Sequence, residues 1–356
     1  MHDPGVPLST AQPVCPIICT VRAFVITAPR QGAVQEVDPP AAKPGEVVID
    51  VRRAGICGTD AELFHGHQGL TPYPVRIGHE WMGTVSAVGD GVSRGWIGRR
   101  VTGDTMLGCG KCRRCRGGRH HVCEFRAELG IRGGRPGALA EQVAVPETAL
   151  YELPDQVSDI QGALVEPGGN ALRAVRAAEL RPGDRLLVLG PGTIGVLAAM
   201  FARASGVEVH LMGRGDRSLP FANTLGFNGV WTADTLPDLP WDAVIDASTA
   251  PELPSKAVQL VEPGKRVVYI GLAATPSMVN SRELVLKEVT AVGILGASAG
   301  LSGAIDAYAR GAVDPTPLVA AVVGLEDLTS ALAGQFPVGT GPGPKIHVAF
   351  SARANP

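Results

Sequence analysis

The middle of the chain reads Arg185-Leu186-Leu187-Val188-Leu189-Gly190-Pro191-Gly192-Thr193-Ile194-Gly195, and this stretch is the most informative about architecture. Its apolar first half predicts a buried strand, and residues 196–204 predict a helix after it. Glycines spaced G-x-G-x-x-G between strand and helix permit a tight turn, a close approach to a pyrophosphate and close helix packing. The helix N-terminus offers free amides to the phosphates. We therefore expect a Rossmann unit, with Gly190, Pro191, Gly192, Thr193, Ile194 and Gly195 as cofactor-binding residues.

The segment after the second predicted strand, 208–212, bears on the choice of coenzyme. An acidic residue at that strand end would hold a free ribose 2′-hydroxyl, but the chain reads Gly213-Arg214-Gly215-Asp216-Arg217. Arginine binds a 2′-phosphate by forked hydrogen bonds, whereas a carboxylate would repel it. The sequence therefore predicts a preference for NADP(H) over NAD(H), with Arg214 and Arg217 as ligands. Asp216 would weaken this preference if it turned back toward the ribose.

The alternation of strands and helices continues toward the C-terminus. Apolar runs at 241–246, 265–271 and 288–293 predict further strands, with helices between them. This order is typical of an α/β fold with a parallel, doubly wound sheet. Residues 299–309 and 325–332 then predict helices, and 345–350 predict a closing strand that we expect to return to the first domain.

The region before residue 150 has a different pattern. Segments 45–51 and 83–89 alternate apolar and polar residues, as half-buried strands do. Many glycines separate these short strands. We therefore expect an irregular, β-rich domain ahead of the cofactor-binding unit.

Composition limits the class of protein. The chain has 356 residues, 45% of them hydrophobic and 19% charged, and a formal net charge of −2. It lacks the basic excess that nucleic-acid binding needs, and it contains no run of 18 apolar residues that would predict a transmembrane helix. The first twenty residues lack the pattern of a signal peptide. We expect a cytoplasmic protein with no nucleic-acid or membrane partner and with its seven cysteines reduced.

Four of the cysteines lie close together, and their spacing is C-x2-C-x2-C-x7-C. Clustered cysteines in a reducing compartment are typical of metal sites, and four thiolates complete the tetrahedron of a structural zinc. The predicted ligands are Cys109, Cys112, Cys115 and Cys123. Five basic residues between them would offset the charge of the thiolates, and we interpret them as a solvated surface rather than an anion site.

A second set of zinc-ligand types runs from Cys57 to Glu80. Cys57, His79 and Glu80 offer a thiolate, an imidazole and a carboxylate. Structural zinc sites favour cysteine and histidine and leave no open position, so a carboxylate indicates a site that keeps a place for water or substrate. Taken singly, Cys57 and His79 are equally compatible with a buried thiol and a core histidine.

The full set of motifs resembles the zinc-dependent medium-chain alcohol and polyol dehydrogenases over nearly all of Val21–Phe350. The resemblance is carried by Gly55-Ile56-Cys57-Gly58-Thr59-Asp60, Gly78-His79-Glu80, the four cysteines, Glu166-Pro167 and the glycine motif, all in matching order. The chain is most similar to the sorbitol, threonine, glucose and aminocyclitol dehydrogenase branches. These branches carry Glu-Pro where liver-type alcohol dehydrogenases place a third ligating cysteine.

This resemblance implies a domain order. Residues 1–20 would be a disordered leader, and 21–167 a GroES-like catalytic domain. Residues 168–297 would be the Rossmann cofactor-binding domain, and 298–356 would return to the catalytic domain. Relatives of this type form homodimers or homotetramers, so we expect a homo-oligomer.

The resemblance also implies roles for individual residues. Cys57 and His79 would bind a catalytic zinc, while Glu80 and Glu166 compete for the third protein position, as ligand or as partner of a metal-bound water.

Thr59 would accept the substrate's hydroxyl proton and relay it. Liver-type relatives have a histidine three positions further along, which passes the proton to solvent. Here that position is Glu62, which either continues the relay or binds substrate hydroxyls.

The implied reaction is hydride transfer between NADP(H) and a secondary alcohol or its ketone, with zinc as Lewis acid. We expect a polyol, sugar or cyclitol substrate ahead of a small apolar alcohol. Four residues near the expected pocket either bind hydroxyls or serve ordinary packing or surface exposure: His65, His67, Gln68 and Trp81. A zinc-free reductase of activated double bonds and a non-catalytic NADPH-binding protein are the alternatives, and the intact Cys57 and His79 argue against both.

Overall fold

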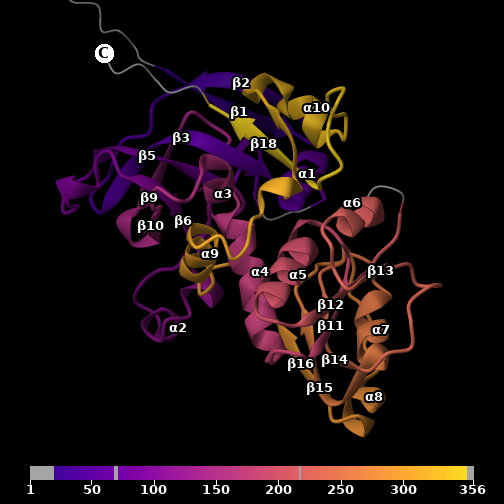
Figure 1. Cartoon of the computed structure of the whole chain (residues 1–356). Helices are drawn as coiled ribbons and strands as arrows, with labels where there is room; N and C mark the ends of the chain where they lie inside the picture. Colours follow the sequence, from indigo (N-terminus) through magenta and orange to yellow (C-terminus); the bar gives the residue numbers. More distant parts are fainter. Residues whose placement is uncertain (1–19, 68–70, 216–217, 351–356) are drawn as a thin grey trace, which may run out of the picture.

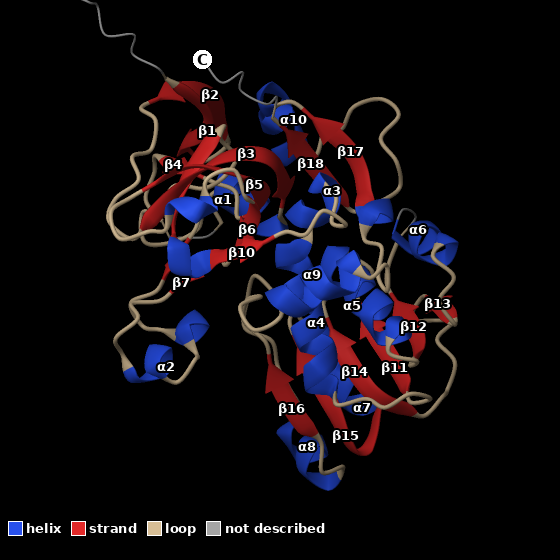
Figure 2. Ribbon diagram, turned by 60° about the vertical axis from the view of Figure 1, so that its left-hand side comes forward, coloured by secondary structure: helices blue, strands red, loops and turns tan. Residues whose placement is uncertain are grey.

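The structure is a computed structural model that describes residues 20–67, 71–215 and 218–350, arranged as two halves (Figure 1). One half is built on antiparallel strands and carries the Cys57–Glu80 segment. The other is a parallel sheet covered by helices, as Figure 2 shows. Among the described residues, no helix is long and apolar enough to cross a membrane.

The first half is organised around a seven-stranded sheet. Its strand order is β10-β6-β5-β3-β18-β17, and β9 also pairs with β3. All of its pairs are antiparallel except β17 with β18. The strands are β3 (Glu46–Ile56), β5 (Glu80–Val88), β6 (Arg100–Gly103), β9 (Gln142–Pro146), β10 (Leu150–Glu152), β17 (Val319–Val323) and β18 (Lys345–Ala349).

Smaller elements complete this half. They are the sheet of β1 (Val21–Ala28), β2 (Gln31–Val37) and β4 (Val75–Arg76), and the pair β7 (Met106–Leu107) and β8 (Ala127–Glu128). The helices are α1 (Gly58–His65), α2 (Arg113–Arg116), α3 (Asp159–Ala163) and α10 (Leu328–Leu332), and the 3-10 turns are Arg94–Trp96, His120–Val122, Glu147–Ala149 and Leu325–Asp327. Phe24, Ile49 and Trp81 are buried in one hydrophobic cluster with β-branched residues of neighbouring strands. This burial is what holds the glycine-rich strands together.

The second half is a six-stranded sheet with the order β13-β12-β11-β14-β15-β16, parallel throughout. Its strands are β11 (Arg185–Leu189), β12 (Glu208–Met212), β13 (Gly229–Trp231), β14 (Trp241–Asp246), β15 (Val261–Tyr269) and β16 (Thr290–Gly293). Its helices are α4 (Val165–Ala178), α5 (Thr193–Ala204), α6 (Ser218–Thr224), α7 (Leu253–Leu260), α8 (Ser281–Leu286) and α9 (Leu301–Ala309), with a 3-10 turn at Thr316–Leu318. The predicted doubly wound α/β fold is confirmed.

Alternation along β11 shows why this strand is central. Leu186 and Val188 pack into the cluster that contains α4, α5 and α9, whereas Leu187 and Leu189 pack into the cluster of α7 on the other face. All four are 0% exposed. Side chains of successive strand residues point to opposite faces, so a continuous apolar run is what a strand covered on both sides requires.

Two element boundaries differ from the sequence prediction. Helix α4 begins at Val165, six residues before the predicted start, and so carries Glu166 and Pro167 in its first turn. Proline is tolerated there because the first amides of a helix have no partner inside the helix. Strand β15 begins at Val261, four residues before the predicted Lys265.

The C-terminal segment serves both halves. Helix α9 packs on α4, and the hydroxyl of Tyr308 donates to the Leu164 carbonyl at 3.1 Å. Further along, β18 pairs with β3 of the first half, opposite Gly55 and Ile56. Residues 298–356 were predicted to return to the catalytic domain. Within this segment α9 packs on the second half, whereas β17 and β18 join the sheet of the first half.

Candidate functional site

The segment that begins at Cys57 is fixed by one buried carboxylate. Cys57 is the N-cap of α1, and Asp60 lies in the first turn of the same helix. Asp60 is 0% exposed and accepts hydrogen bonds from the Cys57 amide at 2.8 Å and the Gly78 amide at 3.1 Å. Asp60 therefore ties the start of α1 to the residue before His79.

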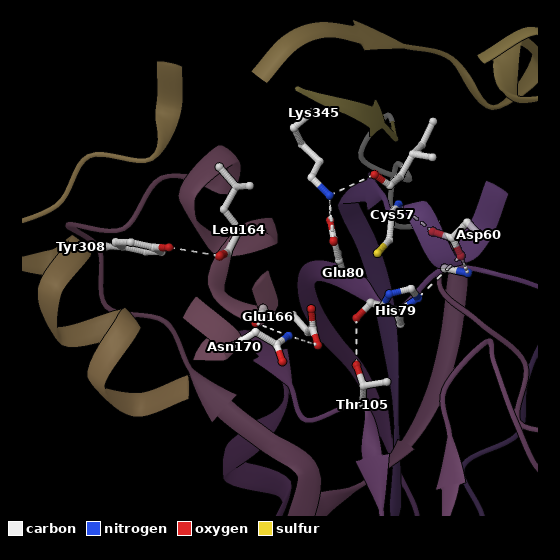
Figure 3. A network of polar contacts seen from close by, with 12 residues as sticks. Cys57, Asp60, His79, Glu80, Thr105, Leu164, Glu166, Asn170, Tyr308 and Lys345 are labelled. Atoms are coloured by element: carbon white, nitrogen blue, oxygen red, sulfur yellow. Dashed lines mark hydrogen bonds and ion pairs between the residues drawn. The ribbon is translucent and has the colours of Figure 1, made fainter. Parts of the chain in front are cut away.

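His79 is buried and held from two sides, as Figure 3 shows. Its Nδ1 lies 3.6 Å from Asp60 Oδ1, and its backbone carbonyl accepts a hydrogen bond from the Thr105 hydroxyl at 3.1 Å. Burial works to lower the pKa of His79, but the charges of Asp60 and Cys57 outweigh it and raise this pKa well above its usual value. Nδ1 faces the Asp60 carboxylate at a distance longer than a hydrogen bond, so Nε2 is the ring nitrogen available to a metal.

Glu80 is bound by a lysine from the distant end of the chain. Lys345 Nζ lies 2.8 and 2.7 Å from the two carboxylate oxygens and also donates to the Ile56 carbonyl at 3.0 Å. Both side chains are at most 3% exposed. A Cβ added to Gly55 would lie 2.3 Å from Glu80 Oε2, so glycine at this position makes room for the carboxylate.

Glu166 reaches the same region from α4. Its Oε1 accepts a hydrogen bond from Asn170 Nδ2 at 2.9 Å. Burial, with a smaller effect from the nearby charge of Glu80, raises the pKa of Glu166 to about 7. In Figure 3 its carboxylate points toward the space that His79 and Cys57 also face.

The donor atoms of Cys57, His79 and Glu80 lie within 4.8 Å of one another. A thiolate, an imidazole and a carboxylate at this separation fit zinc, which accepts all three ligand types in a tetrahedral site. Glu166 is not a member of this tight set, although its charge interacts with both His79 and Glu80. The structure thus brings together the residues that the sequence predicted for a catalytic metal, with two carboxylates for one position.

Other predicted site residues have more varied surroundings. Thr59 is partly buried in the first turn of α1, next to Asp60. Glu62 pairs with His67 at 3.0 Å, and their side chains are 47% and 60% exposed. The ring of His65 stacks on that of His67, with 5.7 Å between centroids.

The sequence left two roles open for Trp81, substrate binding and ordinary packing, and the structure shows packing. Its side chain is 1% exposed and belongs to the hydrophobic core of the first half. Trp81 follows Glu80 on a strand, so it points to the opposite face of the sheet. Gln68, another pocket prediction, lies outside the described residues.

The four clustered cysteines form a lobe beside the first half, the lobe that carries α2 in Figure 2. Their sulfurs all lie within 4.8 Å of one another, with Cys109–Cys115 at 3.9 Å and Cys112–Cys123 at 3.7 Å. Zinc–sulfur bonds of about 2.3 Å in a tetrahedron put neighbouring sulfurs about 3.8 Å apart. Backbone amides of residues 111 and 112 lower the pKa of Cys109 to about 6, toward the thiolate form that binds metal. The four donors therefore fit a closed zinc site.

The predicted dinucleotide site lies at the carboxyl ends of the parallel strands. Gly190 has φ +94°, and a Cβ on Gly195 would lie 1.9 Å from the Gly190 carbonyl oxygen. These are two of the demands that the motif makes on glycine. A cavity of about 1000 Å³ opens here, and its lining includes Gly190, Pro191, Gly192, Met212, Gly213, Arg214 and Ser218. Thr193 and Ile194 begin α5 directly after this lining, while Arg217 lies outside the described residues.

Two residues around the candidate catalytic metal site were given no role by the sequence prediction. Asp60 was quoted in the motif but given no role, although an acid three residues after a candidate ligand at a helix start is a signal for an N-terminal cap. Lys345 gave no usable signal, because a lysine that opens a predicted strand is ordinarily exposed. Its partner Glu80 lies 265 residues earlier in the chain.

Fold and site together define a class: a two-domain dinucleotide-binding oxidoreductase with one open and one closed metal-donor set. Residues 43–155 match the alcohol dehydrogenase GroES-like domain, and residues 193–310 match the zinc-binding dehydrogenase domain. The chain belongs to the zinc-dependent medium-chain dehydrogenase family, as the motifs predicted.

Individual relatives agree with this assignment. The chain is 30% identical to an L-threonine 3-dehydrogenase of Rhizobium rhizogenes, over 86% of this chain and 93% of the relative. It is 33% identical to a 2-dehydro-3-deoxy-L-galactonate 5-dehydrogenase of Pseudoalteromonas atlantica, over 82% of this chain and 89% of the relative. Homology therefore supports an alcohol or polyol dehydrogenase.

Solved structures share the fold over most of the chain. A protein of Escherichia coli CFT073, described as a short chain alcohol dehydrogenase and complexed with NADH, superposes with a TM-score of 0.86 at 27% identity, covering 93% of this chain and 99% of that one. A zinc-binding dehydrogenase of Sinorhizobium meliloti 1021, bound to NADP, has a TM-score of 0.85 at 26% identity, covering 93% and 100%. Similar folds thus hold either coenzyme.

Proposed function

We propose that the protein is a zinc-dependent dehydrogenase that transfers a hydride between a secondary alcohol, or its ketone, and NADP(H). The observation that carries this proposal is that Cys57 and His79 lie together with two carboxylates, Glu80 and Glu166, in a chain that also has a large cavity at the predicted dinucleotide site. When bound, zinc would supply the Lewis acidity that polarises a substrate oxygen and lowers the pKa of a substrate hydroxyl.

We infer that Glu166, rather than Glu80, is the third protein ligand of this zinc. Glu80 is the nearer carboxylate, but both of its oxygens accept hydrogen bonds from Lys345. Glu166 uses one oxygen for Asn170, and no described residue donates to its other oxygen. Exchange of Glu166 for glutamine should therefore lower zinc occupancy more than the same exchange at Glu80. Equal retention of zinc by both variants would argue against this ligand set.

The chain's own hydroxyl for proton transfer is Thr59, which lies two residues after Cys57. A threonine hydroxyl both accepts and donates, so it can take a proton from the substrate and pass it on. Thr59→Val removes this capacity with little change in volume, and we expect kcat for alcohol oxidation to fall by about 10² to 10⁴, as for loss of a general acid–base group. Thr59→Ser is the matched control and should retain most of the activity.

The NADP(H) preference rests on Arg214 at the edge of the dinucleotide cleft. The Ser218 hydroxyl donates to the Arg214 carbonyl at 3.1 Å and so stabilises this turn. Removal of an arginine that pairs with a phosphate typically costs a few kcal/mol. Arg214→Ala should therefore raise KM for NADP about 10- to 100-fold and leave KM for NAD nearly unchanged. Equal losses with both coenzymes would show that Arg214 does not read the 2′-phosphate.

The substrate we propose is a polyol, sugar or cyclitol. The polar pair of Glu62 and His67, half exposed after the candidate metal ligand Cys57, supports binding of several hydroxyl groups. The closing experiment is a panel of polyols, sugars, cyclitols, amino alcohols and simple alcohols, each with NADP and NAD and with zinc measured by mass spectrometry. Failure to oxidise any alcohol, or to reduce any ketone, at full zinc occupancy would refute the proposal.

We further propose that the protein is a homo-oligomer of a reducing, cytoplasmic compartment. The edge strand β16 is exposed, and Val285 and Leu286 of the neighbouring α8 are 78% and 70% exposed. Apolar side chains beside an open sheet edge favour pairing with a second copy. The four-thiolate set requires cysteines that stay reduced. Light scattering coupled to size exclusion tests the assembly, and a monomer would refute it.

A further inference from the structure

The four-cysteine lobe makes two contacts with the rest of the molecule that its own metal does not need. Both come from adjacent histidines between the third and fourth cysteine. His120 Nε2 lies 2.8 Å from Asp104 Oδ2, and His121 Nε2 lies 3.4 Å from Arg173 Nη2. His121 is 8% exposed, so the lobe is seated on the body at this point.

The first contact joins His120 to Asp104, a carboxylate that has two further hydrogen-bond partners. Asp104 is 4% exposed, and its Oδ1 accepts hydrogen bonds from the Ser298 hydroxyl at 3.1 Å and the Met106 amide at 2.9 Å. Ser298 follows β16, the last strand of the coenzyme sheet. Asp104 thus joins the lobe, the catalytic half and the coenzyme half at one buried side chain.

The second contact reaches the coenzyme half directly. Arg173 belongs to α4, the helix that carries Glu166 in its first turn, and its Nη1 also donates to the Leu295 carbonyl at 2.8 Å. Arginine has no acceptor atom, so His121 Nε2 accepts in this pair and the ring is neutral.

The residue next to Asp104 leads to the catalytic donor set. Thr105 donates its hydroxyl to the carbonyl of His79 at 3.1 Å, and the Leu129 amide donates to the Thr105 carbonyl at 3.1 Å. A shift of the Asp104–Thr105 segment therefore moves the backbone of His79. Hydrogen bonds to the surroundings of a metal ligand fix its orientation and affect function nearly as strongly as the ligands do.

We propose that Asp104 is a positioning residue through which the metal-loaded four-cysteine lobe sets the relative position of His79 and the coenzyme half. With zinc bound, the lobe presents His120 and His121 as a rigid pair. Without it, the His120–Asp104 contact is lost, the Asp104–Ser298 bond weakens and coenzyme binding weakens with it. The inference rests on the proposed dehydrogenase function for its effect on catalysis, but its effect on coenzyme affinity is measured without turnover.

The test is a double-mutant cycle on the full-length protein. Asp104→Asn keeps the shape of the side chain, and Cys112→Ser empties the lobe. We expect each to raise the dissociation constant of NADPH, measured by fluorescence titration, by on the order of tenfold, the lower end for loss of an outer partner of a metal ligand. The double variant should bind NADPH no more weakly than Cys112→Ser alone, because both changes remove the same contact between the lobe and the body of the protein.

Two control variants separate this role from a general loss of stability. Asp242→Asn removes a carboxylate that pairs with Lys265 and the Arg185 amide at the opposite ends of the strands, and it should leave NADPH affinity unchanged. Ser298→Ala should reproduce part of the Asp104→Asn effect while zinc stays at two per chain. If Asp104→Asn fails to fold, Ser298→Ala and His120→Asn take its place in the cycle.

Two results would overturn the proposal. The first is that the increases in the NADPH dissociation constant caused by Asp104→Asn and Cys112→Ser multiply in the double variant. The second is that the Cys112→Ser protein binds NADPH with wild-type affinity. Hydrogen exchange of residues 77–82 and 294–299 gives a readout that needs neither coenzyme nor turnover, and it should rise in Asp104→Asn. A wild-type chain that oxidises no alcohol would refute the proposed function. The hydrogen-exchange result would still show whether Asp104 couples the lobe to His79 and the coenzyme half.

Discussion

The two metal-donor sets of this molecule are built in opposite ways. The lobe draws all four ligands from residues 109–123, and its sulfurs lie near the separations of a closed zinc site. The catalytic set draws Cys57 and His79 from one segment and Glu166 from α4, while the neighbouring Glu80 of β5 is held by Lys345 from β18. A closed site is thus local in sequence, whereas the open site depends on the whole fold to assemble it.

This difference has an energetic side. In the lobe all four ligands come from one short segment, so we expect metal binding and local folding to be a single event. In the open site the protein holds buried charges in place before any substrate arrives: Asp60, Glu80 and Lys345 are each at most 3% exposed. Such preorganisation costs stability and is expected where function requires it.

The largest expected effect comes from the open site. Cys57→Ser removes the thiolate ligand, so kcat should fall by at least about 10³ while the fold persists, because Cys57 is partly exposed at a helix start and the strands around it are unchanged. Turnover, circular dichroism and zinc content by mass spectrometry check this. Zinc should fall from two to one per chain. Activity within tenfold of wild type would remove the zinc mechanism.

The matching change in the lobe should act on structure first. Cys112→Ser breaks a four-ligand site whose binding energy is folding energy. We expect the second zinc to be lost and residues 108–126 to become accessible to limited proteolysis, with the parallel sheet intact. Activity should fall much less than in Cys57→Ser, by on the order of tenfold. Loss of the whole fold would show that the lobe is not a separate unit.

Exchange of Lys345 tests whether the open site depends on the distant strand. Lys345→Met removes one partner of a buried ion pair and leaves Glu80 uncompensated, which typically costs about 3–5 kcal/mol. Denaturant unfolding measures this loss. The double change Lys345→Met with Glu80→Gln should recover much of it, because no unpaired charge remains. An unchanged free energy of unfolding in the single variant would mean that the pair contributes nothing.

The sequence revealed these regions to different degrees, for physical reasons. The glycine motif predicted β11 and α5 because Gly190 and Gly195 answer local steric demands, and the cysteine spacing predicted the lobe because its ligands are neighbours. Lys345 and its pairing with Glu80 depend on β18 lying against β3, which is a long-range strand pairing that no local pattern encodes. The sequence did not decide between pocket and core for Trp81, and the alternation of β5 decides it, because Trp81 follows Glu80 and so points to the other face of the strand.

The smallest expected effect comes from a residue on the same face of β18 as Lys345. His347 is 0% exposed, and neither ring nitrogen has a hydrogen-bond partner among the described residues. Burial, with smaller effects from Lys345 and Arg53, lowers its pKa from the usual 6.5 to about 3. The ring is therefore neutral in the folded protein at pH 7. His347→Leu removes two unpaired polar atoms at similar volume, so we expect the free energy of unfolding at pH 7.5 to change by less than about 1 kcal/mol.

Acid should enlarge this small difference, and the sign follows from proton binding. Below pH 6.5 the unfolded histidine takes up a proton that the folded one refuses until about pH 3, so wild-type stability falls across that window. The leucine variant has no such proton to bind and should lose less stability between pH 7 and pH 5. Urea unfolding at both values measures the two slopes. Parallel slopes would mean that water or another hydrogen-bond partner reaches the ring of His347.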